Sequence, residues 1–340
     1  MNRFLLTLQS VTGAITSDKG AALVMVMVIV SAMSAGAVLA FDTMNFSIRK
    51  TARTDMYDQA RLYAYGGENI ARIYAEKLNQ QDQAIKNYMG LNSAQALTYP
   101  IDGGSVTGTL ADASNCFNVN SLLYNPVDTV PTNDMTDGMI RYQSLLAAAG
   151  FADGHAAHLT ATLKDWLDTD TRPSPAGAED YDYALGKAPY RAANTLMADI
   201  SELRLVKGYS LEVLEAIKPF LCVRPDSAPS ALQVNSLLPY QAPLLVSLMG
   251  GKISLSEAAV LISERPSAGY ASVAAFWKER LFNGMIIPQE TRAHITLKPQ
   301  AYLATIKVQF QDAVYVMAST IGMQDDGTSL VLSRTRGVWK

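Results

Sequence analysis

The feature that most constrains this chain is an uncharged apolar run near its start, residues 21–41. The run reads AALVMVMVIVSAMSAGAVLAF and contains no acidic or basic side chain. Because a helix rises about 1.5 Å per residue, it would span about 30 Å, the thickness of the hydrocarbon core of a bilayer. The sequence therefore predicts one membrane-spanning helix over residues 21–41, with a much larger polar region after it.

A polar segment, residues 1–20, precedes the apolar run and ends in Lys19-Gly20. A secretory signal peptide carries its small-residue cleavage site after the apolar segment, whereas Gly20 lies before it. Cleavage between Gly20 and Ala21 would leave the hydrophobic helix as the new N-terminus. This order resembles the precursors of type IV pilin-like proteins. It implies processing by a prepilin peptidase, with the bulk of the chain outside the cytoplasm.

Composition and charge limit the class of protein. The chain of 340 residues is long enough for two domains beyond an anchor, and it is 49% hydrophobic and 17% charged. The net charge of −3 does not favour a surface that binds nucleic-acid phosphates. Basic residues lie on both sides of the apolar run, so the positive-inside rule does not decide its orientation. They are Arg3 and Lys19 before it and Arg49, Lys50 and Arg53 after it.

An apolar stripe continues beyond the membrane-spanning run, at helical steps of three and four residues. No Pro occurs between residues 21 and 99, so we expect one continuous helix over residues 21–79 rather than an anchor and a separate helix. The stripe consists of Ile48, Ala52, Met56, Ala60, Tyr63, Gly67, Ile70, Tyr74 and Leu78.

Strand patterns appear on both sides of a long helical region. Gly103-Gly104 and the alternation in residues 105–114 suggest a first strand hairpin, and residues 116–120 suggest another short strand. Residues 302–310 alternate strictly between the two faces of a strand. Two further strands are expected at 313–320 and 328–336, joined by a turn at residues 325–327. We therefore predict an α+β fold whose antiparallel sheet is interrupted by an all-α domain. The predicted parts are a cleaved leader (1–20), a transmembrane helix (21–41), a helix with the first strands (42–136), the inserted all-α domain (137–297) and the C-terminal strands (298–340).

The helical region contains an internal repeat. The sequence VNSLL occurs at residues 119–123 and again at 234–238, and each copy is followed by helices and an Arg-Pro pair, Arg172-Pro173 and Arg265-Pro266. The first copy carries about twenty extra residues before Asp199. We expect a function specific to the first unit to lie in this insertion.

The insertion is strongly acidic. Six carboxylates fall within residues 165–182 and repel one another unless something positive neutralises them. A hard cation with oxygen ligands, meaning Ca²⁺, suits such a set, although the spacing is not that of an EF-hand. The residues alone leave open a solvated acidic loop with Arg172 and Arg191 as ion-pair partners. A glycosidase-like acid pair has no support elsewhere in the chain. The six are Asp165, Asp168, Asp170, Glu179, Asp180 and Asp182.

Three other features of the sequence are candidate sites. Cys116 and Cys222 are the only cysteines, and in an exported domain they would most simply form one disulfide, with two buried thiols as the alternative. His155 and His158 could ligate a metal but have no suitable third ligand nearby, which favours surface positions. Residues 203–217 resemble a helix-hairpin-helix, yet their charges are mixed, so packing is favoured over DNA binding.

Together these features resemble the minor pseudopilins K of the type II secretion system, the GspK family. The resemblance covers nearly the whole chain. Its most specific parts are Lys19-Gly20, the acidic stretch 165–183, residues 189–208 and the second VNSLL. Prepilin-like proteins typically carry Glu at the fifth residue after the cleaved Gly. That position is Met25 here, and the K subunits characteristically lack this Glu.

The resemblance implies a pseudopilin fold with a large all-α domain inserted in its sheet, and a structural rather than enzymatic role. It implies assembly with minor pseudopilins I and J at the tip of a periplasmic pseudopilus, and contact with other pseudopilins. It places the chain in the inner membrane with its C-terminal domain in the periplasm. The alternative is a membrane-anchored helix-hairpin-helix module that binds nucleic acid. The resemblance also implies calcium, held by Asp165, Asp168, Asp170, Glu179 and Asp180, and less firmly by Asp182.

Overall fold

The structure is a computed structural model. It divides into two compact units, residues 1–58 and residues 59–340, and each is described by itself. The predicted leader and its cleavage residue Gly20 lie outside the described part of the chain. The structure describes residues 21–80, 96–126, 135–185, 188–324 and 326–337.

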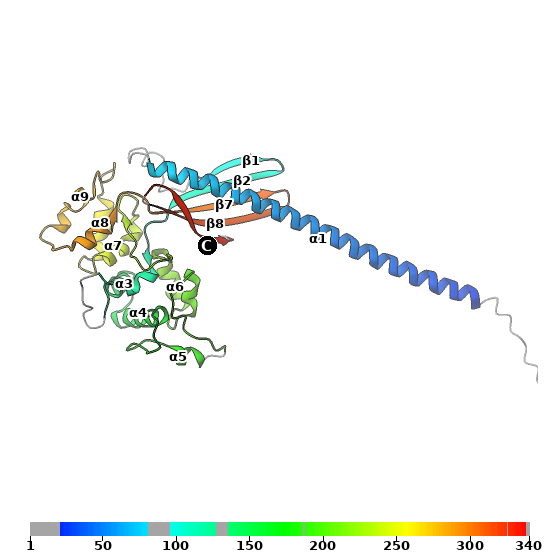
Figure 1. Cartoon of the computed structure of the whole chain (residues 1–340), viewed down its shortest axis with the longest axis horizontal. Helices are drawn as coiled ribbons and strands as arrows, with labels where there is room; N and C mark the ends of the chain where they lie inside the picture. The colour runs from blue at the N-terminus through cyan, green and yellow to red at the C-terminus, as the bar shows by residue number, and fades with distance from the viewer. Residues whose placement is uncertain (1–20, 81–95, 127–134, 186–187, 325, 338–340) are drawn as a thin grey trace, which may run out of the picture. The chain divides into compact units, whose positions relative to one another are not determined.

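The described part of the first unit is the start of one long helix. This helix, α1 (Ala21–Gln80), is continuous as predicted and is the blue element of Figure 1. Within the described residues it is the one helix long and apolar enough to cross a membrane, judged by length and composition. Its apolar side chains from Leu23 to Phe46 are exposed. No described residue covers them, so they require a nonaqueous environment or a partner.

In the second unit, the rest of α1 packs on a five-stranded antiparallel sheet with the order β1-β2-β7-β8-β9. Ala60, Ala64 and Ala75 of the helix are fully buried. A Cβ placed on Gly67 would lie only 3.0 Å from Cγ2 of Ile306 in β7, so a small residue allows this close approach. The strands are β1 (Leu97–Ile101), β2 (Gly104–Asp112), β7 (Ala301–Phe310), β8 (Ala313–Met323) and β9 (Ser329–Arg336).

The helical part of the chain is inserted between two neighbouring strands of this sheet. β2 and β7 pair antiparallel along their whole length, with Asp112 opposite Tyr302. Every residue between them in sequence belongs to the insertion or its connections. The predicted α+β fold, with an antiparallel sheet interrupted by helices, is therefore confirmed.

The insertion consists of two units, each closed by a short parallel strand pair. β3 (Phe117–Asn118) pairs with β4 (Leu221–Cys222), and β5 (Leu232–Gln233) pairs with β6 (Ile295–Thr296). We describe the first unit from residue 117 rather than from the predicted boundary at 137. It holds η1 (Val119–Leu123), α3 (Asp137–Ala148), α4 (Asp153–Leu167), α5 (Asp180–Ala184), η2 (Ile200–Leu205), α6 (Leu211–Ile217) and η3 (Lys218–Phe220). The second unit holds η4 (Pro239–Gln241), α7 (Ala242–Leu248), α8 (Leu255–Ser263), α9 (Val273–Phe276), η5 (Arg280–Phe282) and α10 (Gln289–Ala293).

The two copies of VNSLL make matching contacts. The Asn120 side chain donates to the carbonyl of Met197 (2.9 Å) and accepts from its N–H (2.8 Å). The Asn235 side chain donates to the carbonyl of Tyr270 (3.1 Å) and accepts from its N–H (2.7 Å). Each Asn therefore fixes the backbone of a residue that follows the first two helices of its own unit.

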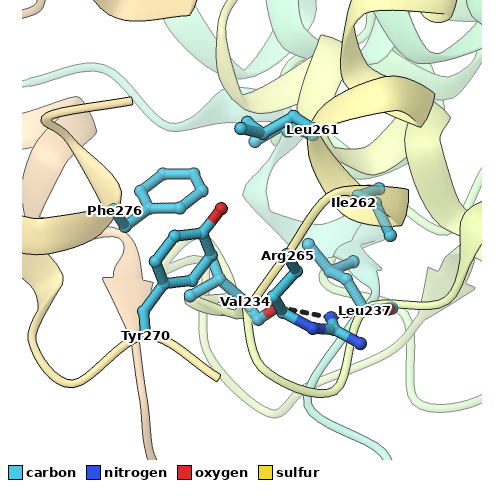
Figure 2. Close-up of a pocket in the computed structure, with 8 residues that line it drawn as sticks. Val234, Leu237, Leu261, Ile262, Arg265, Tyr270 and Phe276 are labelled. Carbon is cyan, nitrogen blue, oxygen red and sulfur yellow. Dashed lines mark hydrogen bonds between the residues drawn. The ribbon is translucent and has the colours of Figure 1, made fainter. Parts of the chain in front are cut away.

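The Arg-Pro pairs, in contrast, are not equivalent. Arg265 reaches back to the second VNSLL, where its Nη1 donates to the carbonyls of Val234 (2.8 Å) and Leu237 (2.9 Å) beside a small apolar pocket (Figure 2). Arg172 is exposed and lies in the acidic loop. In the first unit, the acidic loop thus takes the place of the contact that Arg265 makes with the second VNSLL.

A disulfide joins Cys116 and Cys222 beside the β3–β4 pair, as predicted, with their Cα atoms 5.6 Å apart. It closes the first unit at the point where the chain enters and leaves it. Asn115, next to it, donates to the carbonyl of Gln233 (3.1 Å) and accepts from its N–H (2.8 Å). These bonds tie the entrance of the first unit to the start of the second.

Candidate metal centre

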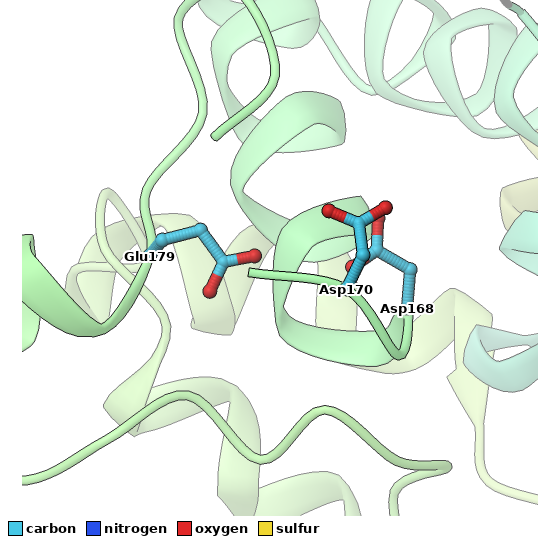
Figure 3. A group of neighbouring side chains, drawn as sticks. All are labelled: Asp168, Asp170 and Glu179. Carbon is cyan, nitrogen blue, oxygen red and sulfur yellow. The ribbon is translucent and has the colours of Figure 1, made fainter. Parts of the chain in front are cut away.

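Three carboxylates meet where α4 ends and the acidic loop returns to α5. Asp168 is the residue at the C-terminal end of α4, Asp170 follows in the loop, and Glu179 precedes α5. One carboxylate oxygen from each lies within 4.8 Å of the other two. Figure 3 shows Glu179 approaching Asp168 and Asp170 from the opposite strand of the loop. A turn over residues 174–177, closed by a hydrogen bond from the N–H of Gly177 to the carbonyl of Ser174 (2.8 Å), brings these residues together although they span 12 positions.

Asp165 organises the loop instead of joining these three. Its side chain is fully buried and accepts hydrogen bonds from the backbone N–H of Ser174 (2.9 Å to Oδ2) and of Ala178 (2.9 Å). A Cβ placed on Gly177 would lie 1.9 Å from Oδ2 of Asp165. Gly177 is therefore required for the loop to approach this carboxylate.

Asp180 and Asp182 also hold backbone or basic groups. Asp180 accepts from the N–H of Ala192 (3.0 Å), and the Arg191 guanidinium lies 3.9 Å away and is 86% exposed. Asp182 accepts from the N–H of Glu179 (3.3 Å) and pairs with Lys207 at 2.6 Å. The predicted ligand set thus divides into a cluster of three and a supporting group that fixes the loop.

The negative charge of the cluster is poorly compensated by other groups within the described residues. Glu179 is 3% exposed, and neither of its carboxylate oxygens has a hydrogen-bond partner there; Oδ1 of Asp168 is buried and unpartnered in the same way. The other oxygen of Asp168 lies 3.5 Å from the Lys164 ammonium. Burial of polar oxygens without partners is costly, so this arrangement calls for a positive ligand.

The electrostatics of the cluster point the same way. Burial, together with the negative charges of Asp165 and Asp168, raises the pKa of Glu179 to about 7. Burial also raises the pKa of Asp168, although Lys164 opposes the change. A divalent cation would remove this cost by stabilising the ionised forms. Carboxylate oxygens are the donors that Ca²⁺ and other hard cations prefer, so these residues fit such an ion.

Sequence reasoning missed the residues that support the loop from outside the acidic set. His158, considered above as a metal ligand, instead contacts the carbonyl of Ala176 through its Nδ1 at 2.7 Å. Trp166 packs edge-on against Tyr183, with ring centroids 5.3 Å apart, and Tyr183 packs against Tyr190. The aromatic residues interleaved with the acids in the sequence were the available signal for this aromatic packing.

Comparison with known proteins places the chain. Two family models, both described as "Type II secretion system (T2SS), protein K", match residues 115–226 and 232–298, which correspond to the two helical units. A type II secretion system protein K from Aeromonas hydrophila is 32% identical over 77% of this chain and 78% of its own length. This chain belongs to the type II secretion system protein K family.

Other members of the protein K family cover still more of the chain. The Pectobacterium carotovorum subsp. carotovorum protein is 29% identical over 92% of this chain and 95% of its own. The fold also matches a chain in the crystal structure of the GspK-GspI-GspJ complex from enterotoxigenic Escherichia coli. That match has a TM-score of 0.70 and 22% identity, and covers 85% of this chain and 100% of the other. The predicted role as a minor pseudopilin is confirmed, and the nucleic-acid-binding alternative is not supported.

Proposed function

We propose that this minor pseudopilin caps the tip of a periplasmic pseudopilus and aids its assembly for the export of folded proteins. The observation that carries this proposal is the insertion of two helical units between β2 and β7. They add bulk to the helix-and-sheet head that a subunit in the middle of a fibre would have to accommodate. The role is structural and requires no catalytic turnover.

Met25 supports a position with no subunit above. In a pilin-like fibre, a Glu at the fifth mature position is thought to neutralise the N-terminal amine of the neighbouring subunit above, because an unpaired charge in an apolar environment is costly. Met25 cannot do this. A subunit at the tip has no such amine to neutralise, so the absence of the Glu carries no cost there.

The anchor and its processing follow the same reasoning. Residues 21–41 cross the inner membrane once, a prepilin peptidase cleaves between Gly20 and Ala21, and residues after the span lie in the periplasm. Support comes from the exposed apolar start of α1 and from the Cys116–Cys222 disulfide, which suits an oxidising compartment. The neighbouring structure is a complex of GspK with GspI and GspJ, so minor pseudopilins I and J are the proposed partners.

We further propose that Asp168, Asp170 and Glu179 bind Ca²⁺, with Asp165 and Asp180 positioning the loop. The ion's contribution is structural, because it neutralises the buried Glu179, the half-buried Asp168 and the exposed Asp170 together and closes the acidic loop. The unpartnered oxygens of Glu179 and Asp168 are the main support.

Calcium titration calorimetry on the full chain in detergent tests the metal proposal. We expect binding that Asp168→Asn or Asp170→Asn weakens at least tenfold, with no change in Asp312→Asn, an exposed acid in the turn between β7 and β8. If all of these variants bind calcium as tightly as the wild-type chain, the loop is a solvated acidic surface and not a metal site.

A strain lacking the gene tests the secretory role independently of calcium. We expect folded exoprotein to accumulate in its periplasm, and the full chain to co-purify with pseudopilins I and J. Normal secretion by the deletion strain would contradict the proposed function.

A further inference from the structure

We propose that Arg49, Lys50 and Arg53 of α1 form a binding surface for the phosphate groups of anionic lipids. These three residues are called the basic face. The lipids would lie in the leaflet from which α1 emerges after its apolar run. The inference rests on the membrane anchor proposed above, since it takes the apolar run as the membrane-spanning segment.

The position of the basic face along α1 is the first support. Asp42 is the single charged residue between Ala21 and Arg49. Arg49 lies about 12 Å along the helix axis from Phe41, and Arg53 about 18 Å. The headgroup layer extends roughly 5–8 Å beyond the hydrocarbon. Long basic side chains can reach back toward this layer, and charges act across a Debye length of about 8 Å at physiological salt.

The distribution of charge around the helix is the second support. Arg49 and Arg53 are four residues apart and Lys50 is three before Arg53, so all three lie on one side of α1. Asp55 follows Arg53 by two residues, so it lies about half a turn around the helix from Arg53. Asp58 follows Arg49 by nine residues, so it lies about half a turn around the helix from Arg49. The basic face is thus separated from the nearest following acids.

Among the residues that the structure describes, the basic face also has no partner. All three side chains are exposed, and none has an ion pair or a hydrogen bond to another described residue. Lys and Arg are less frequent beyond the translocated end of a span than before it, so a group of three there is unusual. Anionic headgroups supply a counter-charge at the right depth. Each basic residue close to an anionic leaflet strengthens attraction roughly fivefold, and Asp42, on the same side as Arg49, would offset part of the total.

Native mass spectrometry of the full chain, released from detergent with equal amounts of phosphatidylglycerol and phosphatidylcholine, measures this preference. We expect phosphatidylglycerol to be retained about tenfold over phosphatidylcholine at low salt, and the preference to shrink at high salt. Replacing the basic face by Gln should bring the ratio to within twofold of unity. The matched control removes three exposed cations from the helical insertion and should keep the preference: Lys252→Gln, Lys278→Gln and Lys298→Gln.

Three results would overturn the proposal: no lipid preference in the wild-type chain, an unchanged preference after loss of the basic face, or an equal loss in the control. Loss of binding to another pseudopilin with the lipid preference intact would assign the basic face to a protein interface instead. Flotation with phosphatidylcholine vesicles separates this inference from the anchor. A chain that does not float contradicts the anchor, whereas one that floats without lipid preference contradicts only the basic face.

Discussion

Glu68 of α1 and Arg334 of β9 form a two-pronged ion pair across the helix–sheet interface, although 266 residues separate them. Nε of Arg334 lies 2.8 Å from Oε2 of Glu68, and Nη2 lies 2.8 Å from Oε1. Glu68 is 3% exposed and also accepts from the Ser319 hydroxyl in β8. The last strand of the sheet is thus joined to the helix by charge, and Arg72 and Glu76 of α1 add hydrogen bonds with Ser329 at the start of the same strand.

Removing the arginine from this pair should destabilise the second unit. Arg334→Ala leaves the Glu68 carboxylate buried without its cation, and we expect a loss of about 2–3 kcal/mol in the free energy of unfolding. The estimate lies below that for a fully buried pair because half of the Arg334 side chain is exposed. Urea unfolding of the full chain in detergent measures the loss. Lys307→Ala, on an exposed position of β7, is the control and should change stability by less than about 0.5 kcal/mol.

The sequence predicted those elements whose structure depends on the local pattern of residues, and it failed where a distant contact determines the structure. Strict alternation in residues 302–310 predicted β7 because one face of that strand is buried against α1. The stretch 116–120 was expected to be a strand, but only Phe117 and Asn118 pair, and a 3₁₀ helix begins at Val119. There the Asn120 side chain must turn inward to reach Met197, a contact 77 residues away that no local pattern encodes.

The candidate metal centre shows the same limit. Asp165 and Asp168 are three residues apart on consecutive turns, and the sequence offers no reason to assign them different roles. The path of the loop decides, because it brings the N–H groups of Ser174 and Ala178 to Asp165 and brings Glu179 to Asp168. The acidic character of the site was predictable from the sequence. Which carboxylates form the cluster and which position the loop was not.

The metal-free chain should become less stable as the pH rises through neutrality. The folded pKa of Glu179 is about 7, above its ordinary value of 4.5. The folded state therefore holds this proton more tightly than the unfolded chain does. Its contribution to stability is fully present below pH 4.5 and is lost as the pH rises through about 7. Melting curves in EDTA between pH 5 and 8 measure the decline. Glu179→Gln, which cannot ionise, should flatten it, and an unchanged slope in that variant would assign the decline to other groups.

The pH dependence contributed by Glu68 has the opposite sign. Burial alone would raise its pKa, but hydrogen bonds from Arg334 and Ser319 and the charges of Arg334 and Arg72 bring the pKa below 4.5. This stabilisation is present above the unfolded pKa and is lost as the pH falls through the folded value. Glu68→Gln should therefore reduce the loss of stability on acidification below pH 4.5. A variant with the same acid sensitivity as the wild type would contradict this assignment.

Reduction of the disulfide should loosen the first helical unit before the second. Cys116 and Cys222 close a loop with a sequence separation of 106, for which the chain-entropy account gives roughly 4–5 kcal/mol. The second unit is closed by the β5–β6 pair without a disulfide. Limited proteolysis with and without dithiothreitol measures the difference, and early cuts within residues 117–222 are expected only after reduction. The double variant Cys116→Ser/Cys222→Ser should behave like the reduced chain, and equal protection of the two chains would contradict the prediction.

Adding one methyl group at Gly177 should disrupt the acidic loop while leaving the fold intact. The new Cβ would meet Oδ2 of Asp165 at 1.9 Å, so the loop must move away from the carboxylate that accepts its N–H groups. Glu179, two residues on, would move with it, and calcium affinity should fall at least tenfold. Gly154→Ala is the matched control, because this position lies in the first turn of α4 with no atom within 4 Å of the added Cβ. Calorimetry on both variants decides the matter: unchanged calcium binding by Gly177→Ala would show that the path of the loop does not set the geometry of the site.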